Sequence, residues 1–296
     1  MTGIYLNESD DLIDICLDNV FKAVFTKNTP ESQGALAKLL SAVIGRNLSV
    51  ILITGNEPPV DNLRDRQIRF DINCKAMDAS GELLNIEMSL NPDKFEPLRL
   101  EFHAGKLFTS QDIRGSGKSY SDLKEAYQIA FLVKGRFFQD GDFLHRFEYY
   151  DQLRDVSLEG RSRIITIELA KVEKAAEKPV VEMESSERWA FYFRYITDRS
   201  KRWKINEILE YEEGIAMASQ VLASISRDEV ERARLMSEYK YVVDTQSKVV
   251  DARREGRQEG RQEGKLEVAK TLKTLGDPLE KIARVTGLSP DEIAGL

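Results

Sequence analysis

Cysteine and histidine are scarce in this sequence of 296 residues, which holds two of each. Cys16 and Cys74 lie in apolar surroundings, and neither has a histidine at the short spacing of a zinc-binding motif. The sequence therefore predicts neither a zinc site nor a disulfide framework, and we expect both thiols in the hydrophobic core. His103 and His145 are isolated in the sequence, so we interpret them as structural residues rather than as catalytic bases.

Long apolar runs are also absent. No segment approaches the roughly 20 apolar residues that a helix needs to span a bilayer. Acidic residues interrupt the stretch 1–14, which excludes the apolar core of a signal peptide there. We therefore expect a cytoplasmic protein.

Positive charge is in the minority, since Lys and Arg number 43 against 50 Asp and Glu, for a net charge of -7. Affinity for nucleic acids comes largely from neutralising phosphates with Lys and Arg, so the overall composition does not predict it. Binding to DNA would need local patches. The sequence offers three of them, one at Arg64, Arg66 and Arg69, one at Arg114 and Lys118, and one within 188–204, where basic and aromatic residues alternate. For the third, the alternative is a helix whose aromatic residues form a core and whose charges are solvated.

Two segments, 68–76 and 83–90, alternate apolar and polar residues with the period of two that is typical of half-buried strands. Gly81 lies between them and can supply the positive φ that a short hairpin loop needs. These features predict a hairpin with a loop at 79–81, in which Asp78 pairs with Glu82.

In that register Asp71 faces Ser89 and Asn73 faces Glu87, with opposite residues about 5 Å apart. Two carboxylates side by side on rigid strands repel each other unless a cation or a proton lies between them, and Mg²⁺ and Mn²⁺ favour such oxygen ligands. This face of the hairpin therefore predicts a divalent metal site. The alternative is an ordinary solvated strand face, since Asp and Glu are common on exposed strands.

The patterns divide the chain into three parts. Residues 1–175 alternate helical and strand patterns, which predicts an α/β domain. The stretch 174–181 is rich in Ala, Glu and Lys and suits an exposed connection, and helical periodicity then dominates 186–250 as an accessory region. Residues 251–296 form a third part with a glycine repeat and a helical hairpin, which we interpret as a dimerisation or regulatory module.

Glycines recur every fourth residue at 256, 260 and 264 within the segment 254–265. On a helix they would form one stripe, flanked by Glu on one edge and by Arg or Lys on the other. Each glycine costs a helix about 1 kcal/mol relative to Ala, and close approach of a second helix is the usual compensation. A parallel second copy would place the acidic edge against the basic edge, so the repeat predicts a homodimer. A flexible polar linker is the alternative that this composition also permits.

The last stretch, 278–294, predicts a helix, a Thr-Gly turn and a second helix that Ser289 caps. The second helix carries acidic residues but no Lys or Arg, so it would repel DNA phosphates. We expect a packing or regulatory role for it.

One motif and five further segments together resemble a known family. The motif joins Asp18, Phe21, Lys22 and Phe25 on one predicted helix. The segments are 34–44, 69–72, 85–89, 99–108 and 120–132. In these segments the chain resembles the PD-(D/E)xK nuclease superfamily, in the transposase branch that includes the Rpn-type recombination-promoting nucleases. The likeness continues into the tail and spans nearly the whole chain.

This resemblance implies an α/β fold with a restriction-endonuclease-like core, in which helices flank a mixed sheet. It also implies that Asp71 and Glu87 bind Mg²⁺ or Mn²⁺, with Asp18 as a further candidate ligand on the first helix. A simple capping or solvated role is the alternative for Asp18.

The chain departs from the family at Ser89, where the resemblance implies a Lys or Gln that positions the attacking water. A serine hydroxyl reaches less far and carries no positive charge. Gln128 on the next predicted strand, or Lys106 on the intervening helix, is the candidate replacement.

The function so implied is a metal-dependent DNA endonuclease, associated with recombination or DNA mobility, that uses a metal-activated water on a phosphodiester. Arg69, Arg114 and Lys118 are the candidate DNA-binding residues. Because of Ser89, a catalytically weakened family member that binds DNA or a partner protein is the alternative.

Overall fold

The computed structural model describes residues 4–48, 51–55, 71–78, 80–113 and 117–296, and the basic residues Arg64, Arg66, Arg69 and Arg114 lie outside this part. Contacts divide the chain into two compact units, 1–236 and 237–296. The three-part division at 1–175, 186–250 and 251–296 stays a prediction.

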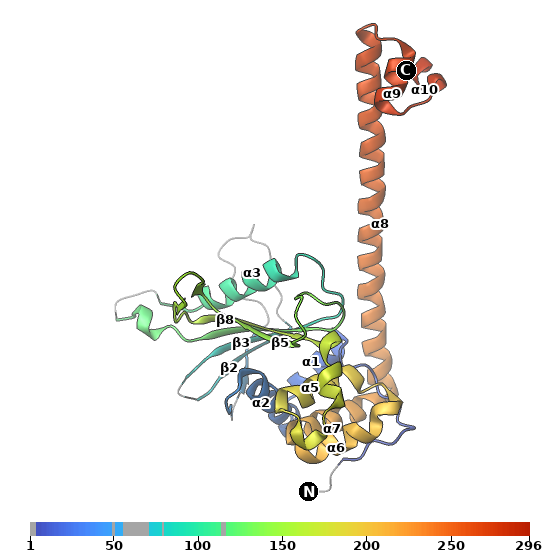
Figure 1. Cartoon of the computed structure of the whole chain (residues 1–296). Coiled ribbons are helices and arrows are strands. Elements are labelled where there is room, and N and C mark those ends of the chain that lie inside the picture. Colours follow the sequence, from blue (N-terminus) through green and yellow to red (C-terminus); the bar gives the residue numbers. More distant parts are fainter. Residues whose placement is uncertain (1–3, 49–50, 56–70, 79, 114–116) are drawn as a thin grey trace. The chain divides into compact units, whose positions relative to one another are not determined.

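The first unit is built around a six-stranded mixed sheet (Figure 1). Its order is β1 (Ile51–Ile53), β2 (Ile72–Ala76), β3 (Leu83–Ser89), β4 (Ala126–Leu132), β8 (Ser162–Glu168) and β5 (Leu144–Phe147). β3, β4 and β8 run parallel, and the other neighbours pair antiparallel. β4 is buried along its whole length, which fits its nearly continuous apolar sequence, because a central parallel strand is covered on both faces. This architecture confirms the predicted α/β class.

Helices cover both faces of the sheet (Figure 1). On one face lies α3 (Glu96–Thr109), whose Leu100 packs with Ala130 and Leu132 of β4. On the other lie α1 (Asp18–Thr26) and α2 (Pro30–Ile44), and Phe21 of α1 contacts Phe131 of β4. The two faces of β4 thus belong to two separate cores.

The core on the α1 face is aromatic. The Phe21 ring lies 4.9 Å from Phe25 and 6.0 Å from Phe193, and Phe25 lies 6.0 Å from Trp189. Cys16 and Cys74 are buried free thiols, as the sequence predicted.

Helices dominate the chain after β8. They are α4 (Glu173–Glu177), α5 (Ser185–Tyr195), α6 (Arg202–Tyr211), α7 (Glu213–Arg227) and α8 (Glu229–Thr274). Short 3₁₀ helices are η1 (Tyr120–Asp122), η2 (Leu169–Lys171), η3 (Val180–Glu182) and η4 (Arg199–Lys201), and a two-stranded ladder joins β6 (Tyr150–Asp151) to β7 (Val156–Ser157). The stretch 174–181 is mostly exposed, and its two buried residues, Ala175 and Val180, lie where α4 contacts α5 and η3 contacts α6.

The second unit joins the C-terminal part of α8 to α9 (Leu279–Thr286) and α10 (Pro290–Ala294). Its core consists of Ala269, Ile282, Leu288 and Ile293. Gly287 ends α9 with a φ of 69°, and Ser289 Oγ accepts a hydrogen bond from the Glu292 N–H at 3.3 Å. Both features confirm the predicted turn and cap. Among the helices that the structure describes, none is long and apolar enough to cross a bilayer.

The glycine repeat at 254–265 lies within α8 and is therefore helical. A Cβ added at Gly256, Gly260 or Gly264 would meet no atom within 4 Å. The described part of the chain thus offers no close neighbour to compensate for the helix cost of these glycines.

The hairpin register differs by two residues from the predicted one. Ile72 pairs with Ile86, and the Ala76 N–H donates to the Glu82 carbonyl at 2.9 Å. The connection therefore spans 77–81, and Asp78 does not pair with Glu82 across the strands.

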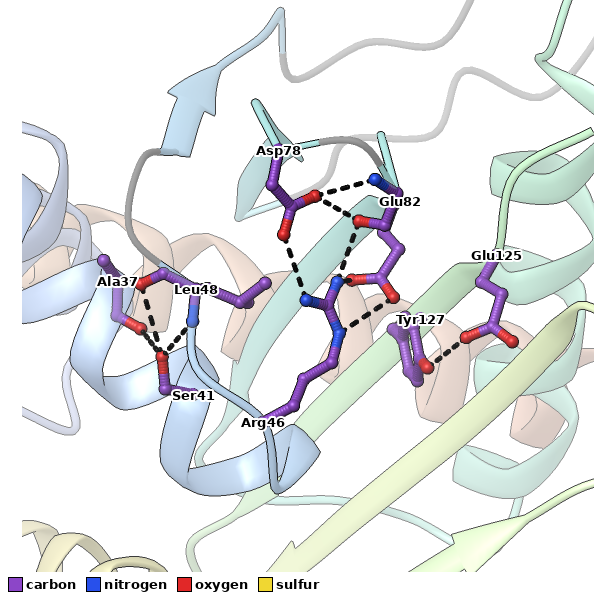
Figure 2. A network of polar contacts seen from close by, with 9 residues as sticks. Ala37, Ser41, Arg46, Leu48, Asp78, Glu82, Glu125 and Tyr127 are labelled. Carbon is purple, nitrogen blue, oxygen red and sulfur yellow. Dashed lines mark hydrogen bonds and ion pairs between the residues drawn. The ribbon is translucent and has the colours of Figure 1, made fainter.

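Arg46, just after α2, accounts for this register (Figure 2). Its Nη1 lies 3.0 Å from Asp78 Oδ2, and its Nε donates to Glu82 Oε1 at 3.2 Å. Two like charges directly opposite on a ladder destabilise it, whereas here both carboxylates bind one guanidinium. Such a contact from a distant segment cannot be deduced from the local alternation of residues.

Candidate active site

Asp71 and Glu87 lie on neighbouring strands of the sheet. Asp71 immediately precedes β2 and Glu87 lies in the middle of β3. Because Ile72 pairs with Ile86, the register carried one residue further brings Asp71 to the level of Glu87. The predicted pairing of Asp71 with Ser89 is therefore wrong. The error of two residues leaves every side chain on its predicted face, because the side-chain period of a strand is two.

Asp71 is held by a backbone amide and a lysine. The Met88 N–H donates to Asp71 Oδ2 at 3.0 Å, and Lys22 Nζ of α1 lies 3.1 Å from Asp71 Oδ1. The same ammonium lies 2.9 Å from Asp18 Oδ2. Burial, followed by the charge of Asp18, raises the pKa of Asp71 to about 7, although Lys22 and the Met88 N–H oppose this.

Glu87 is only 2% exposed and is surrounded by polar groups. Its Oε1 contacts His103 Nδ1 and accepts a hydrogen bond from Asn85 Nδ2 at 3.2 Å, and Arg99 Nη1 lies 3.2 Å from Oε2. Burial raises the pKa of Glu87, but the His103 hydrogen bond and the Arg99 charge outweigh it, so the pKa lies below its ordinary value. Oε2 accepts no hydrogen bond from the described residues.

Sequence reasoning missed the contribution of α3 to this site. Arg99 and His103 are four residues apart and therefore project from the same side of the helix. Leu100, Ala104 and Leu107 are the buried apolar residues beside them. The helical spacing of these apolar residues identifies the buried side of α3, and from it the sequence could have predicted that His103 faces the sheet.

Gln128 and Ser89 lie on the same face of the sheet as Glu87. Gln128 is fully buried beside Asn85, from whose Nδ2 it accepts a hydrogen bond at 2.6 Å. Ser89 is partly buried and pairs with Leu132. Gln128 thus contacts the site through Asn85.

The remaining predicted residues are distributed around the site. Asp18 is joined to Asp71 through Lys22. Lys106 lies on α3 three residues beyond His103. Lys118 Nζ lies 2.9 Å from Asp112 Oδ2. Arg69 and Arg114 lie outside the described residues.

The donor set fits a hard divalent cation that keeps several of its waters. Two carboxylates meet at one level of the sheet, and a buried Glu87 oxygen accepts no hydrogen bond from the described part of the chain. Mg²⁺ is usually bound through one or two carboxylates together with waters and substrate phosphates. Within the described ranges no group of three or more His, Cys, Asp and Glu is arranged to hold a metal ion, so a complete protein cage for the ion is not present there.

Replacing Arg99 with Met is expected to lower the free energy of unfolding by about 1–2 kcal/mol at pH 7, a figure reduced for the partial exposure of Arg99. The buried Glu87 and Glu96 would each lose a cation. Because Arg99 helps to depress the Glu87 pKa, the stabilisation it gives is present above the ordinary Glu pKa and is lost as the pH falls. Urea unfolding at pH 7 and pH 4 measures both effects.

Arg136→Met is the matched control, because that arginine is exposed and lies 3.7 Å from an exposed Glu173. It should change the free energy of unfolding by less than about 0.5 kcal/mol. Equal losses in the two variants would contradict the assigned role of Arg99.

A mixed sheet that carries paired carboxylates on adjacent strands, between helical layers, is the architecture of a restriction-endonuclease-like fold. The chain belongs to the PD-(D/E)XK nuclease family transposases, whose family model matches residues 15–252. The match includes the whole sheet and α1 to α7, and leaves 253–296 outside it. Neither the curated proteins nor the solved structures give a match. Family membership gives the chain a nuclease-type function linked to transposition.

Proposed function

We propose that this protein is a metal-dependent endonuclease that hydrolyses phosphodiester bonds of DNA, with Mg²⁺ or Mn²⁺ held by Asp71 and Glu87. The observation that carries the proposal is the placement of these two carboxylates at one level of β2 and β3. Membership in the PD-(D/E)XK nuclease family transposases supports it. With DNA as its substrate, its proposed place of action is the cytoplasm.

A bound divalent ion would supply a more nucleophilic water and neutralise charge that develops on the phosphate. The chain's own residues orient the carboxylates. The Met88 N–H and Lys22 fix the two oxygens of Asp71, and His103 fixes Oε1 of Glu87. Ligands held in this way need little rearrangement before the reaction.

Lys22 and Arg99 supply positive charge that Ser89 cannot. Lys22 Nζ lies 3.1 Å from Asp71 and Arg99 Nη1 lies 3.2 Å from Glu87, while both side chains are partly exposed to solvent. A phosphate entering the site would therefore meet two cations beside the carboxylates, and each can share its hydrogen bonds with a phosphate oxygen.

Gln128 and Asp18 act indirectly in this proposal, through the side chains that they position. Gln128 positions Asn85, which donates to Glu87, and Asp18 holds Lys22 beside Asp71. Both are positioning residues rather than groups that contact the reacting atoms.

Arg69, Arg114 and Lys118 complete the proposal as contacts to the DNA backbone. Lys118 is paired with Asp112, so a phosphate would replace that carboxylate as its partner. Exchange of one exposed ion pair for another costs little free energy, because surface pairs contribute only about 0–1 kcal/mol.

The proposed function is tested by incubating purified full-length protein with supercoiled plasmid or with single-stranded DNA in Mg²⁺, Mn²⁺ or EDTA. Nicking that requires the metal is the expected result. Cleavage that persists in EDTA, or no cleavage in either metal, contradicts the proposal.

A second candidate function is a catalytically weakened family member that binds DNA or a partner chain. Ser89 favours it, and so does the pairing of both carboxylates with cations of the chain itself. Metal-independent retention of DNA in a gel-shift experiment, without cleavage, is its expected signature. A Ser89→Gln variant that gains metal-dependent cleavage would support the same reading, because the substitution restores a longer donor.

We also propose that the glycine stripe of α8 joins two copies in a parallel homodimer. A triple change of Gly256, Gly260 and Gly264 to Ala is expected to weaken self-association about 10-fold or more, because added Cβ atoms hold the helices apart. It should also raise helix content, since each glycine costs a helix about 1 kcal/mol. Sedimentation equilibrium and circular dichroism measure the two effects.

Gly105→Ala is the control, because Gly105 is an exposed helical glycine with open space around its Cα. It should leave self-association unchanged. A monomeric wild-type protein, or unaltered association of the triple variant, contradicts the proposed dimer.

A further inference from the structure

A hollow lies on the α3 face of the sheet, beside the carboxylate site. Its volume is about 270 Å³, and Leu100 and Ala104 of α3 line one side of it. Apolar and aromatic side chains supply most of the remaining lining, namely Pro97, Leu132, Phe137, Phe138, Phe147, Tyr149 and Ile164. A cavity of ~150 Å³ holds one benzene ring, so this hollow admits a larger planar group.

The aromatic wall is ordered by contacts among its own rings. Phe138 lies 4.6 Å from the His145 ring and 5.2 Å from the Phe147 ring. Phe147 and Tyr149 are 40% and 57% exposed, so the wall opens to solvent. The hollow is therefore accessible to a ligand from outside the protein.

One polar group in the lining has no partner. Thr166 is 2% exposed, and its Oγ1 accepts and donates no hydrogen bond among the described residues. A buried hydroxyl without a partner carries a desolvation cost that a ligand with a polar edge would relieve. A purely apolar ligand would leave this cost in place.

The hollow and the proposed metal site share one row of the sheet. Glu87 pairs with Ala130, and Ala130 pairs with Thr166. Two strand spacings separate Thr166 from Glu87, which is roughly 10 Å. Glu96, which also lines the hollow, binds Arg99, and Arg99 reaches Glu87.

We propose that this hollow receives one unpaired nucleobase of the DNA whose backbone lies at Asp71 and Glu87. The inference rests on the proposed function and specifies its substrate as DNA with an unpaired base next to the cleaved bond. A base has a flat π-face for the aromatic wall and a polar edge for Thr166. A phosphate does not fit, because the lining is largely apolar and its charged members, Glu96, Glu101 and Glu148, are acidic.

The probe is a DNA duplex that carries 2-aminopurine as a single-base bulge, compared with the same duplex fully paired. Equilibrium binding to the full chain in EDTA is expected to favour the bulged duplex by roughly 5- to 100-fold, the range for stacking of one base on aromatic side chains. The 2-aminopurine fluorescence should fall on binding, because the base stacks on the rings.

Ala104→Leu fills the hollow from α3 and should abolish the preference for the bulge. Gly105→Leu adds the same side chain one residue further along α3, where no atom lies within 4 Å of the new Cβ, and should preserve the preference. Thr166→Val keeps the shape of the side chain and should lower affinity for the bulge by roughly 3- to 10-fold. If Ala104→Leu does not fold, Thr166→Val decides the question.

Equal binding of bulged and paired duplex, or an unchanged preference in Thr166→Val, would overturn the inference. These measurements contain no metal and read binding alone. A protein that cleaves DNA without a bulge preference therefore refutes only this inference, whereas a bulge preference without cleavage refutes only the proposed nuclease activity.

Discussion

Glu87→Gln is expected to lower the rate of Mg²⁺-dependent DNA cleavage by about 10²- to 10³-fold or more. Gln keeps the size of the side chain and an oxygen that can face His103, but it loses the charge that would hold the metal. The Arg99 guanidinium and the His103 ring would then lie against a neutral amide. Asp71→Asn should produce a loss of similar size, since either substitution removes half of the proposed ligand pair.

Initial rates of plasmid nicking at saturating Mg²⁺ measure this loss. Glu173→Gln is the control, because that carboxylate is exposed on α4 and lies outside the site. Its rate should match that of the wild type. An active Glu87→Gln protein would show that another group holds the metal or that the activity comes from a contaminant.

Asp71→Asn is expected to raise the free energy of unfolding by about 1–3 kcal/mol at pH 8 in EDTA. The pKa of Asp71 is about 7 in the folded protein against an ordinary 3.8, chiefly because of burial. Between these two values the folded state binds the proton more tightly than the unfolded state, so stability falls as the pH rises through this window. Above pH 7 the destabilisation caused by the ionised Asp71 is complete. The Asn variant removes this destabilisation, but it also loses the ion pair with Lys22, which offsets part of the gain.

Urea unfolding at pH 8 and at pH 4 measures this prediction, and the advantage of Asp71→Asn should shrink toward pH 4. Asp78→Asn is the matched control of opposite sign, because hydrogen bonds from Ser80 and Arg46 hold the Asp78 pKa at about 2. That variant should not gain stability at pH 8. An Asp71→Asn protein that is no more stable than the wild type at pH 8 would contradict the claim that ionised Asp71 destabilises the folded protein.

Together these two outcomes would mark Asp71 as a residue kept for function at a cost in stability. A buried carboxylate near a second carboxylate destabilises the metal-free fold, and a bound cation removes that cost. Natural proteins commonly show this conflict between activity and stability at their active sites.

The alternation of residues around Asp71 and Glu87 was sufficient to predict their shared face. The predicted loop at 79–81 was wrong, yet the shift of two residues left the parity of both strands intact. The alternation of residues therefore predicted correctly that the two carboxylates share a face, although the loop predicted from Gly81 gave them the wrong cross-strand partners.

The groups that surround this pair could not be predicted in the same way. Lys22 and Arg99 lie on α1 and α3, outside the hairpin, and only the packing of these helices on the sheet brings them to Asp71 and Glu87. His103 looked isolated because its partner lies sixteen residues away on a different element. Local patterns describe faces of elements, whereas these contacts depend on how the elements pack.

The stretch 174–181 was predicted to be an exposed connection, and most of its residues are exposed. Ala175 and Val180 are the two that are buried, where α4 contacts α5 and η3 contacts α6. The composition of a short stretch indicates its general exposure but not which single residues pack against a neighbouring element.

The most direct test of the account is Mn²⁺ binding to the full chain, followed by loss of the electron paramagnetic resonance signal of free Mn²⁺. If Asp71 and Glu87 hold the metal, the wild type binds a Mn²⁺ ion that Glu87→Gln and Asp71→Asn do not bind, whether or not DNA is cleaved. Equal Mn²⁺ binding by all three proteins, or none by the wild type, would contradict the assignment of Asp71 and Glu87 as the metal ligands.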